Sequence, residues 1–388
     1  MSDCIASVKA FVVTIPRDDP YLGMLQPGEE PNEQGYFVRE KNRTVYPTVD
    51  RSVVVKMETA QGVVGWGETY GIVAPGATVA LIEELLAAFT IGRDPLDREA
   101  VHDDLYDLMR VRGYTGGFYL DALAALDIAL WDIAAKQSGV SLAKLIGGQR
   151  HQSVAAYISG LPKPTLNERA ELAAHWLDQG FDSFKFAAPI ADDGVVQEIK
   201  VLREVLGDNA RIACDMHWMH GADEAIGLIR SMEPHKLWFA EAPVKPENVK
   251  GLAKVARSVA TPIAAGEEWR TVFDAAARIE QQACGIVQPE MGHTGITEFM
   301  RIARYAEVHH LEVIPHATIG VGIFLAASLH ASAAIAACTG HEFQHSIFEK
   351  NLRYLDTDFR CEKGFYSIPS GLGLGVSLDE AAVSPYIS

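Results

Sequence analysis

Cysteine is scarce, and the cysteines that are present form no pattern. The five cysteines lie far apart along 388 residues, and no C-x-x-C pair occurs. This spacing argues against a disulfide framework and against a zinc site, and it favours a reducing compartment. The first ten residues lack the basic run and apolar stretch of a signal peptide, so we expect a cytoplasmic protein.

Positive charge and long apolar runs are also in short supply. The sequence has 34 Lys and Arg against 51 Asp and Glu, a net charge of −17. Because phosphate groups are bound by clustered Lys and Arg, neither nucleic acid nor an anionic membrane is an expected partner. The most apolar stretch, residues 319–338, contains His330 and two glycines, which predicts a buried helix and not a membrane span.

The remaining composition is that of a folded protein, with 48% hydrophobic and 22% charged residues. In the first 135 residues, the runs 53–58 and 63–68 flank a glycine-containing turn and predict a β-hairpin. Residues 20–47 form a long polar segment, which is typical of a functional lid or of disorder. Helices are expected over 77–88, 97–109 and 119–138.

Residues 136–355 have a different rhythm, in which short apolar runs alternate with amphipathic helices. One helix begins at a capping box, Thr165 to Glu168. Strands are expected at 153–158, 181–186, 211–216, 237–241, 262–265, 285–288, 311–314 and 342–344. Alternating strands and helices predict a parallel sheet, and eight such units predict an α/β fold with a (β/α)8-type barrel.

A polar residue stands at the end of most of the expected strands. In chain order these residues are Lys185, Asp215, Glu241, Glu267, Glu290, His316 and His345. Because the carboxyl ends of barrel strands surround the active site, we expect these side chains around one mouth.

Three of them, Asp215, Glu241 and Glu267, are carboxylates on consecutive strands. Gathered together they repel one another, and a divalent cation with oxygen ligands relieves that repulsion. We therefore predict one Mg²⁺ per active site, bound by these three residues. The alternative is that each is a separate solvated group or a helix cap.

Two histidines are candidates for acid–base chemistry. His217 follows Asp215 by two residues, so on a strand both side chains would point the same way. Glu290 ends the strand before His316, and a neighbouring carboxylate orients an imidazole and raises its basicity. That context makes His316 the candidate base, although a lone histidine is more often structural.

These residues resemble the mandelate racemase group of the enolase superfamily. The resemblance is carried by residues 61–68 and 121–133, by Glu241-Ala242-Pro243, Ala264-Ala265-Gly266-Glu267, Gln288-Pro289-Glu290 and Pro315-His316, and by the final Gly371–Gly375. It implies an α+β capping domain, residues 1–135 with a returning C-terminal segment 356–388, over a barrel of residues 136–355. It also implies a Mg²⁺-dependent abstraction of the proton α to a substrate carboxylate.

Departures from the family pattern sharpen this expectation. Many relatives have Lys-x-Lys on the second barrel strand, but here Ala187 replaces the second Lys, which weakens simple racemisation. Asp215-Met216-His217 looks most like galactonate dehydratase and related sugar-acid dehydratases. By that resemblance His316, paired with Glu290, takes the α-proton and His217 protonates the departing β-hydroxyl.

The eighth strand departs further, because relatives place a substrate-binding Glu there and the aligned residue here is His345. A protonated His345 could donate the same hydrogen bond, and Glu342 or Glu349 would serve if the register differs. Lys185 would add positive potential for a substrate carboxylate, or would form an ion pair inside the barrel.

The sequence therefore predicts a Mg²⁺-dependent sugar-acid dehydratase that yields a 2-keto-3-deoxy acid. The alternatives are a cycloisomerase or an epimerase or racemase of a sugar acid or its lactone, and a non-catalytic sugar-acid binder. Specificity is assigned to the 20–47 segment, where Tyr36, Arg39 and Arg43 would reach substrate hydroxyls or a distal carboxylate, or would only solvate the loop. We also expect a homo-oligomer.

Overall fold

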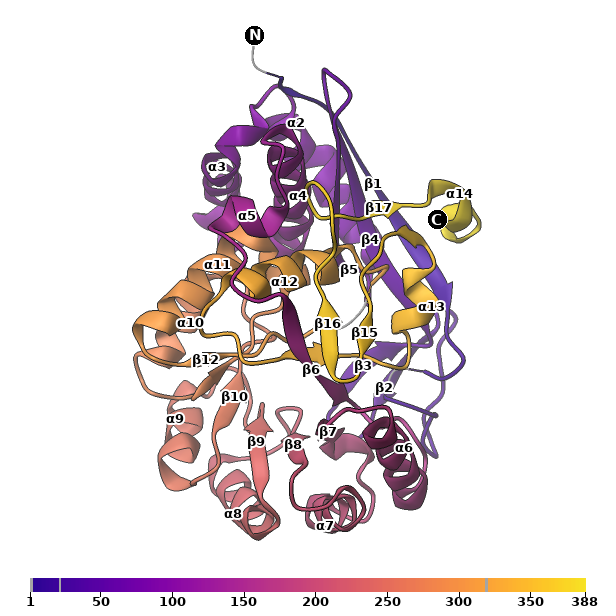
Figure 1. Cartoon of the computed structure of the whole chain (residues 1–388), viewed down its shortest axis with the longest axis vertical. Helices are drawn as coiled ribbons and strands as arrows, with labels where there is room; N and C mark the ends of the chain where they lie inside the picture. The colour runs from indigo at the N-terminus through magenta and orange to yellow at the C-terminus, as the bar shows by residue number, and fades with distance from the viewer. Residues whose placement is uncertain (1–2, 21, 318–319) are drawn as a thin grey trace.

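An antiparallel sheet covered by helices sits over a barrel of parallel strands (Figure 1). The structure is a computed structural model that describes residues 3–20, 22–317 and 320–388. The α/β fold with a barrel-type domain and an α+β capping domain is confirmed.

The capping sheet has the order β1-β4-β5 and is antiparallel throughout. Its strands are β1 (Ile5–Pro16), β4 (Val49–Thr59) and β5 (Val64–Tyr70). The predicted hairpin is therefore confirmed as β4 and β5, whereas β1 was not expected. β1 is covered on both faces, since Val13 and Ile15 are buried on one face and Ala10 and Val12 are buried on the other.

Helices follow the capping sheet at the three predicted places. They are α1 (Pro75–Ala80), the π-helical η1 (Leu81–Leu86), α2 (Ala87–Thr90), η2 (Pro95–Asp97), α3 (Arg98–Arg110) and α4 (Gly117–Gln137). Every residue of α4 from Tyr119 to Ala135 is buried. Its low polarity explains this, and its three aspartates each have partners outside the helix: Trp66 and Leu374 for Asp132, Thr297 for Asp127, and His293 for Asp121.

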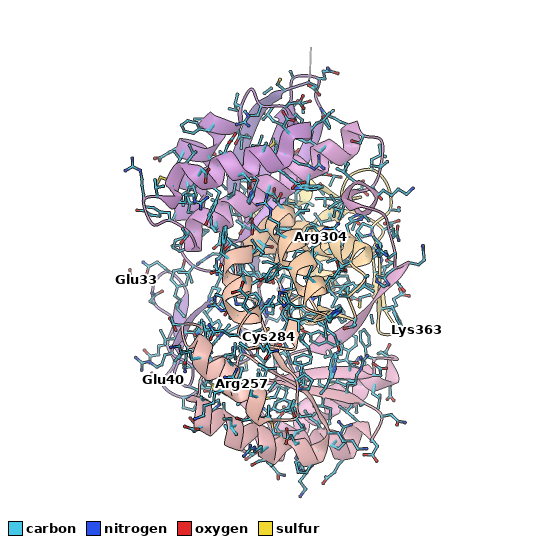
Figure 2. The ribbon with its side chains drawn as sticks, turned by 90° about the vertical axis from the view of Figure 1, so that its left-hand side faces the viewer. Glu33, Glu40, Arg257, Cys284, Arg304 and Lys363 are labelled. Atoms are coloured by element: carbon cyan, nitrogen blue, oxygen red, sulfur yellow. The ribbon has the colours of Figure 1, made fainter. Side chains whose placement is uncertain are left out.

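The 20–47 segment is not an irregular loop, because it contains a second hairpin. Its strands are β2 (Tyr36–Arg39) and β3 (Thr44–Pro47), paired antiparallel. The turn between them passes through Arg43 at φ 59°. Figure 2 shows Glu33 and Glu40 of this segment at one side of the molecule, between the capping helices and the barrel. Four-residue strands in a polar stretch give too weak an alternation for sequence reasoning to detect.

All eight predicted barrel strands occur, and neighbours in the sequence are neighbours in the sheet. They are β6 (Ser153–Ser159), β7 (Ser183–Ala187), β8 (Arg211–Asp215), β9 (Leu237–Glu241), β10 (Ile263–Ala265), β11 (Ile286–Val287), β12 (Glu312–Val313) and β13 (His341–Phe343). β13 pairs with β6, and a parallel bridge from Val313 to Cys338 joins β12 toward β13. The ring of strands is thus completed.

Helices connect the barrel strands on the outside. They are α5 (Leu142–Ile146), α6 (Leu166–Asp178), η3 (Ala188–Ile190), α7 (Val195–Leu206), α8 (Ala222–Met232), η4 (Glu233–His235), α9 (Val249–Ser258), α10 (Val272–Ile279), α11 (Met291–Val308) and α12 (Ile323–Ala334). The capping box at Thr165 is confirmed. The predicted buried helix is α12, although Ile319 at its expected start lies outside the described residues.

The C-terminal segment runs back to the capping sheet. Its elements are α13 (Phe348–Leu352), β14 (Leu355–Asp356), β15 (Cys361–Glu362), β16 (Phe365–Ser367), β17 (Ser377–Leu378), α14 (Glu380–Val383) and η5 (Ser384–Tyr386). β16 pairs antiparallel with β6, and the backbone N–H of Ser388 donates to Val12 on β1 at 3.0 Å. The domain boundaries near residues 135 and 355 stay predictions.

Across the described residues, no single helix has the length and apolar character needed to cross a membrane. One pair of bent segments, Pro75–Thr90 with Pro95–Arg110, meets the length and composition criteria jointly, with a bend of 114° between them.

Candidate active site

A cavity of about 280 Å³ lies between the carboxyl ends of the barrel strands and the N-terminal region. The barrel contributes a polar wall that includes Ser159, Lys185, Asp215, His217, Glu267, His316 and Glu342. The N-terminal region contributes a mainly apolar wall that includes Arg17, Leu22, Thr44, Val45, Tyr46, Tyr70 and Ile72. A small ligand here would touch charged groups on one side and apolar groups on the other.

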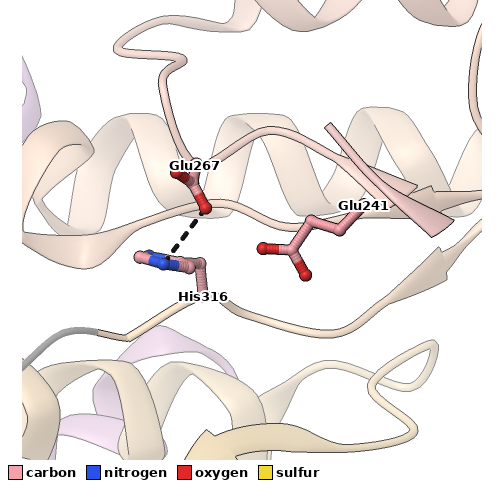
Figure 3. A group of neighbouring side chains, drawn as sticks. All are labelled: Glu241, Glu267 and His316. Atoms are coloured by element: carbon pink, nitrogen blue, oxygen red, sulfur yellow. Dashed lines mark ion pairs between the residues drawn. The ribbon is translucent and has the colours of Figure 1, made fainter. Parts of the chain in front are cut away.

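The predicted metal ligands come from three neighbouring strands. Asp215 and Glu241 are register partners on β8 and β9, and Glu267 lies two residues after the end of β10. Ligand atoms of Glu241, Glu267 and His316 all lie within 4.8 Å of one another (Figure 3). Asp215 borders the same cavity, but its carboxylate contacts His217 instead. The structure thus gathers two predicted ligands with His316, and places the third beside them.

Gly266 allows the chain to bring Glu267 to the cavity. Its φ is 138°, and a Cβ at this position would lie 2.9 Å from the backbone nitrogen of Gln288. Only glycine tolerates such a close approach to the next strand. Glu267 therefore turns over the barrel mouth, where Figure 3 shows its carboxylate facing His316.

The carboxylate of Glu267 suits a divalent cation. Its Oε2 is buried and accepts no hydrogen bond from the described residues, although Nε2 of His316 lies 3.1 Å away. Burial, with the nearby charges of Asp215 and Glu241, raises the pKa of Glu267 well above its ordinary value. A cation would satisfy the orphaned oxygen and favour the ionised form. Carboxylate oxygens are the donors that Mg²⁺ prefers, so the residues present fit that ion.

His316 is held between carboxylates. Its Nδ1 lies 2.7 Å from Oε2 of Glu290, and its Nε2 lies 3.1 Å from Oε2 of Glu267 and 3.4 Å from Oε2 of Glu342. Burial alone would lower the pKa of His316, but the charges of Glu267, Glu342 and Glu290 raise it well above the ordinary value. The predicted pairing of His316 with Glu290 is present.

His217 meets Asp215 by a different route from the one expected. β8 ends at Asp215, and His217 lies beyond it in the left-handed region at φ 47°, so strand alternation does not orient it. Instead its backbone N–H donates to Oδ1 of Asp215 at 2.9 Å, and its Nε2 lies 2.9 Å from Oδ2. Burial favours the neutral carboxyl, but these contacts outweigh it and lower the pKa of Asp215 to about 2.

Lys185 forms an ion pair inside the barrel. Its Nζ lies 2.8 Å from Oε1 of Glu241 and 3.0 Å from Oε1 of Glu342. Burial would lower the pKa of Lys185, but these two carboxylates raise it well above its ordinary value. Lys185 is therefore a fixed positive charge beneath the cavity.

The structure corrects the register at the eighth strand. Glu342 lines the cavity, accepts from Ser159 Oγ, and accepts from the backbone N–H of Ala317 at 2.8 Å. His345 lies outside the cavity lining, with Nε2 3.0 Å from the carbonyl oxygen of Gly160 and its ring against Trp176. Burial lowers the pKa of His345 to about 4, so a protonated His345 is not present near neutral pH.

The structure also corrects the residues expected to contact substrate from the 20–47 segment. Arg39 is fully buried and pairs with Glu29 at 2.9 Å, while Arg43 is exposed beside Glu40. Tyr36 packs under Arg51 and accepts from the backbone N–H of Ala74 at 3.0 Å. The residues of this segment that line the cavity are Leu22, Thr44, Val45 and Tyr46.

Sequence reasoning missed several cavity residues. Tyr70, Trp218, Arg270, His293 and Gln344 line the cavity, as does Arg17. Tyr70 ends β5 and Trp218 follows His217, so their positions beside recognised residues were the available signal. His293 and Arg270 stand just past strand ends, and nothing in their neighbouring residues distinguishes them.

Comparisons with known proteins match this architecture. Residues 168–382 match the family described as enolase C-terminal domain-like, and residues 41–147 match the mandelate racemase / muconate lactonizing enzyme N-terminal domain. The chain belongs to the enolase superfamily.

Named relatives of this enolase-superfamily chain include two sugar-acid enzymes. It is 33% identical to D-galactonate dehydratase of Ralstonia pickettii over 88% of this chain and 92% of the relative. It is 30% identical to D-galactarolactone cycloisomerase of Agrobacterium fabrum over 86% of this chain and 90% of the relative. A solved structure of a candidate isomerase from Sinorhizobium meliloti is 63% identical, with a TM-score of 0.98 and full coverage of both chains.

Proposed function

We propose that this enolase-superfamily protein is a Mg²⁺-dependent sugar-acid dehydratase that converts an aldonic acid to a 2-keto-3-deoxy acid. The observation that carries the proposal is the position of His316, with Nδ1 on Glu290 and Nε2 turned toward Glu267. A base beside a carboxylate cluster suits removal of a proton next to a metal-held carboxylate.

The proposed ligands of the cation are Asp215, Glu241 and Glu267. A bound Mg²⁺ would supply the positive charge that a substrate carboxylate needs when its α-proton leaves. The pairing of Lys185 with Glu241 and Glu342 offsets part of the negative charge of these two carboxylates at the cavity wall, in a molecule that is acidic as a whole.

His316 and His217 divide the proton transfers. Nδ1 of His316 donates a hydrogen bond to Glu290, and a cation bound at Glu267 would offset the charge that raises the pKa of His316, so Nε2 of the resulting neutral ring is the atom that takes the α-proton. The electron pair of the broken C–H bond forms the Cα=Cβ bond, and the β C–O bond breaks. His217 gives a proton to the departing hydroxyl, which leaves as water, and the resulting enol tautomerises to the keto acid.

A panel of aldonic and aldaric acids, each mixed with the protein and Mg²⁺, tests this function. We expect a 2-keto-3-deoxy acid from at least one aldonic acid, detected as its semicarbazone or by NMR. Absence of keto acid across the panel, with Mg²⁺ binding demonstrated by calorimetry, would overturn the proposal.

A cycloisomerase or epimerase acting through the same proton abstraction is the second candidate. It is favoured by the 30% identical D-galactarolactone cycloisomerase, which is as extensively aligned as the dehydratase. Incorporation of solvent deuterium at the α-carbon without loss of water would favour this reaction over dehydration.

A further inference from the structure

A third histidine–carboxylate pair borders the cavity, apart from His316 with Glu290 and His217 with Asp215. Nδ1 of His293 lies 2.7 Å from Oδ1 of Asp121, and His293 lines the cavity. Asp121 belongs to α4 of the capping domain, whereas His293 lies in the first turn of α11 on the barrel. The pair therefore joins the two domains at the cavity wall, and no step of the proposed reaction uses it.

The proton between these two residues belongs to His293. Burial favours the neutral carboxyl of Asp121, but His293 and Arg270 outweigh it and lower the pKa of Asp121. Arg270 contacts both oxygens of this carboxylate, at 3.2 and 3.4 Å. An ionised carboxylate only accepts hydrogen bonds, so Nδ1 of His293 must be the donor.

His293 consequently carries its acceptor on the ring nitrogen that Asp121 does not contact. Burial and the charge of Arg270 lower the pKa of His293, so the ring is neutral near neutral pH. In a neutral imidazole whose Nδ1 is protonated, Nε2 is a hydrogen-bond acceptor. No hydrogen bond from any described residue reaches this Nε2. The ring is held by stacking on Tyr70, with centroids 4.3 Å apart.

The acceptor Nε2 of His293 needs a substrate group that donates a hydrogen bond. An ionised carboxylate of the substrate has no proton to donate, so a second carboxylate does not suit this position. A hydroxyl group has a proton to donate and therefore suits this position. In the proposed reaction the α-carbon faces His316 and the β-hydroxyl is assigned to His217. The α-hydroxyl is assigned to the proposed cation, beside the substrate carboxylate, so the hydroxyls that remain for His293 are those on the γ-carbon or further along the chain.

We propose that His293 is a substrate-binding residue whose Nε2 accepts a hydrogen bond from a substrate hydroxyl at or beyond the γ-carbon. This inference rests on the proposed function for the placement of the substrate. Asp121 is a positioning residue, since it fixes the tautomer and the orientation of the ring, and Arg270 at the cavity wall holds Asp121 in its ionised form.

Nitrogen NMR of protein labelled with ¹⁵N-histidine tests the acceptor directly. The resonances are assigned with His293→Asn, and we expect Nδ1 to be protonated and Nε2 to be unprotonated at pH 7. Addition of D-galactonate with Mg²⁺ should shift Nε2 toward a hydrogen-bonded value, and Asp121→Asn should disturb the tautomer. A protonated Nε2, or an Nε2 unaffected by D-galactonate and by every other aldonic acid of the panel, would overturn the proposal.

Kinetics on D-galactonate and its 4-, 5- and 6-deoxy analogues test whether His293 binds a substrate hydroxyl. A site built to bind a hydroxyl rejects the analogue that lacks it, so one deoxy acid should lose about 10²-fold or more in kcat/KM. In His293→Leu, the ratio of kcat/KM on D-galactonate to kcat/KM on that deoxy acid should fall below about tenfold, mostly through a change in KM. The matched control is His102→Asn, because His102 pairs with Asp103 at 3.1 Å but does not line this cavity. An unchanged ratio in His293→Leu would contradict the inference.

The two experiments separate this inference from the proposed function. If the wild-type protein converts no acid of the panel, dehydration is refuted and the nitrogen spectra alone decide the role of His293. If an aldonic acid is converted but His293→Leu keeps full discrimination between hydroxy and deoxy acids, dehydration stands and the assignment of His293 is wrong.

Discussion

Lys185 places its Nζ within 2.9 Å of both carboxylate oxygens of Glu241, inside the barrel. The same Nζ lies 3.0 Å from Glu342, so one cation holds carboxylates from β9 and β13. All three side chains are buried. The ammonium group thus offsets part of the negative charge of two carboxylates beside a site proposed for an acidic substrate, in a protein with a net charge of −17.

Replacing Lys185 with Met should destabilise the protein strongly. The substitution removes the shared cation and leaves two buried carboxylates without compensation, which typically costs about 3–5 kcal/mol. Urea unfolding monitored by circular dichroism measures the change. Lys144→Met on the exposed side of α5 is the control. A loss below about 1 kcal/mol, as for an exposed ion pair, would show that the pair does not stabilise the fold.

His316→Asn should abolish turnover while the protein still binds Mg²⁺. The variant lacks the atom that takes the α-proton, and loss of a positioned base typically costs about 10²–10⁴-fold in rate. Its carboxylate neighbours Glu241 and Glu267 remain in place. Turnover is measured on the converted acid of the panel, and Mg²⁺ binding by calorimetry. Survival of turnover would mean that another group removes the proton.

Glu342→Gln should lower kcat, whereas His345→Gln should leave it nearly unchanged. Glu342 lies 3.4 Å from Nε2 of His316 and lines the cavity, so Glu342→Gln removes a charge beside the proton-accepting atom. We expect kcat to fall by about tenfold to a hundredfold. His345→Gln is the matched control, because its side chain lies outside the cavity lining and an amide can still donate to Gly160. Equal losses in both variants would contradict the corrected register.

The barrel could be predicted from the sequence because its signal repeats. Each βα unit contributes an apolar run and a polar strand end, so an error in one unit leaves the others in agreement. The pairing of His316 with Glu290 followed from two consecutive strand ends. The sequence predicts less well which residue of a given strand reaches the cavity. The eighth strand is only three residues long, so an error in its register placed His345 where the structure has Glu342.

The residues that the sequence misplaced or missed depend on tertiary contacts, and these contacts leave no pattern in the neighbouring residues. Arg39 looks like a surface cation in the sequence, but Glu29 and two backbone carbonyl groups bury it completely. His293 has no carboxylate beside it in the sequence, since Asp121 lies 172 residues away. Contacts between domains of this kind become visible only when the fold is known.

Acid should destabilise the fold through His330. Its Nε2 lies 3.1 Å from the carbonyl oxygen of Leu374, its Nδ1 is buried without a hydrogen-bond partner among the described residues, and burial lowers its pKa to about 4. The unfolded chain binds this proton near pH 6.5, so stability is complete above that pH and falls as the pH decreases toward 4. At about 1.4 kcal/mol per pKa unit, the loss is at most about 3.5 kcal/mol.

Urea midpoints between pH 7.5 and 4 measure this effect. His330→Asn should flatten the decrease relative to the wild type, because Asn binds no proton in either state. The exposed His309, replaced by Asn, should leave the profile unchanged. Parallel profiles for the wild type and His330→Asn would mean that His330 does not contribute to acid sensitivity.

Glu68 joins the capping domain to the barrel, and its replacement by Gln should loosen that joint. The carboxylate of Glu68 on β5 accepts from the backbone N–H groups of Ile323 at 2.8 Å and Phe324 at 3.1 Å, at the start of α12, and also from Ser52. Burial raises the pKa of Glu68, whereas these donors favour its ionised form. Gln has one acceptor oxygen and would turn an amide N–H₂ toward N–H donors that already face the site.

We expect Glu68→Gln to lose about 1–3 kcal/mol in unfolding free energy, typical of buried donors left unsatisfied. Glu380→Gln, which alters only the exposed pair with Lys56, is the control. Hydrogen exchange should show faster exchange at the start of α12 in Glu68→Gln, and unchanged protection there would contradict this role for Glu68.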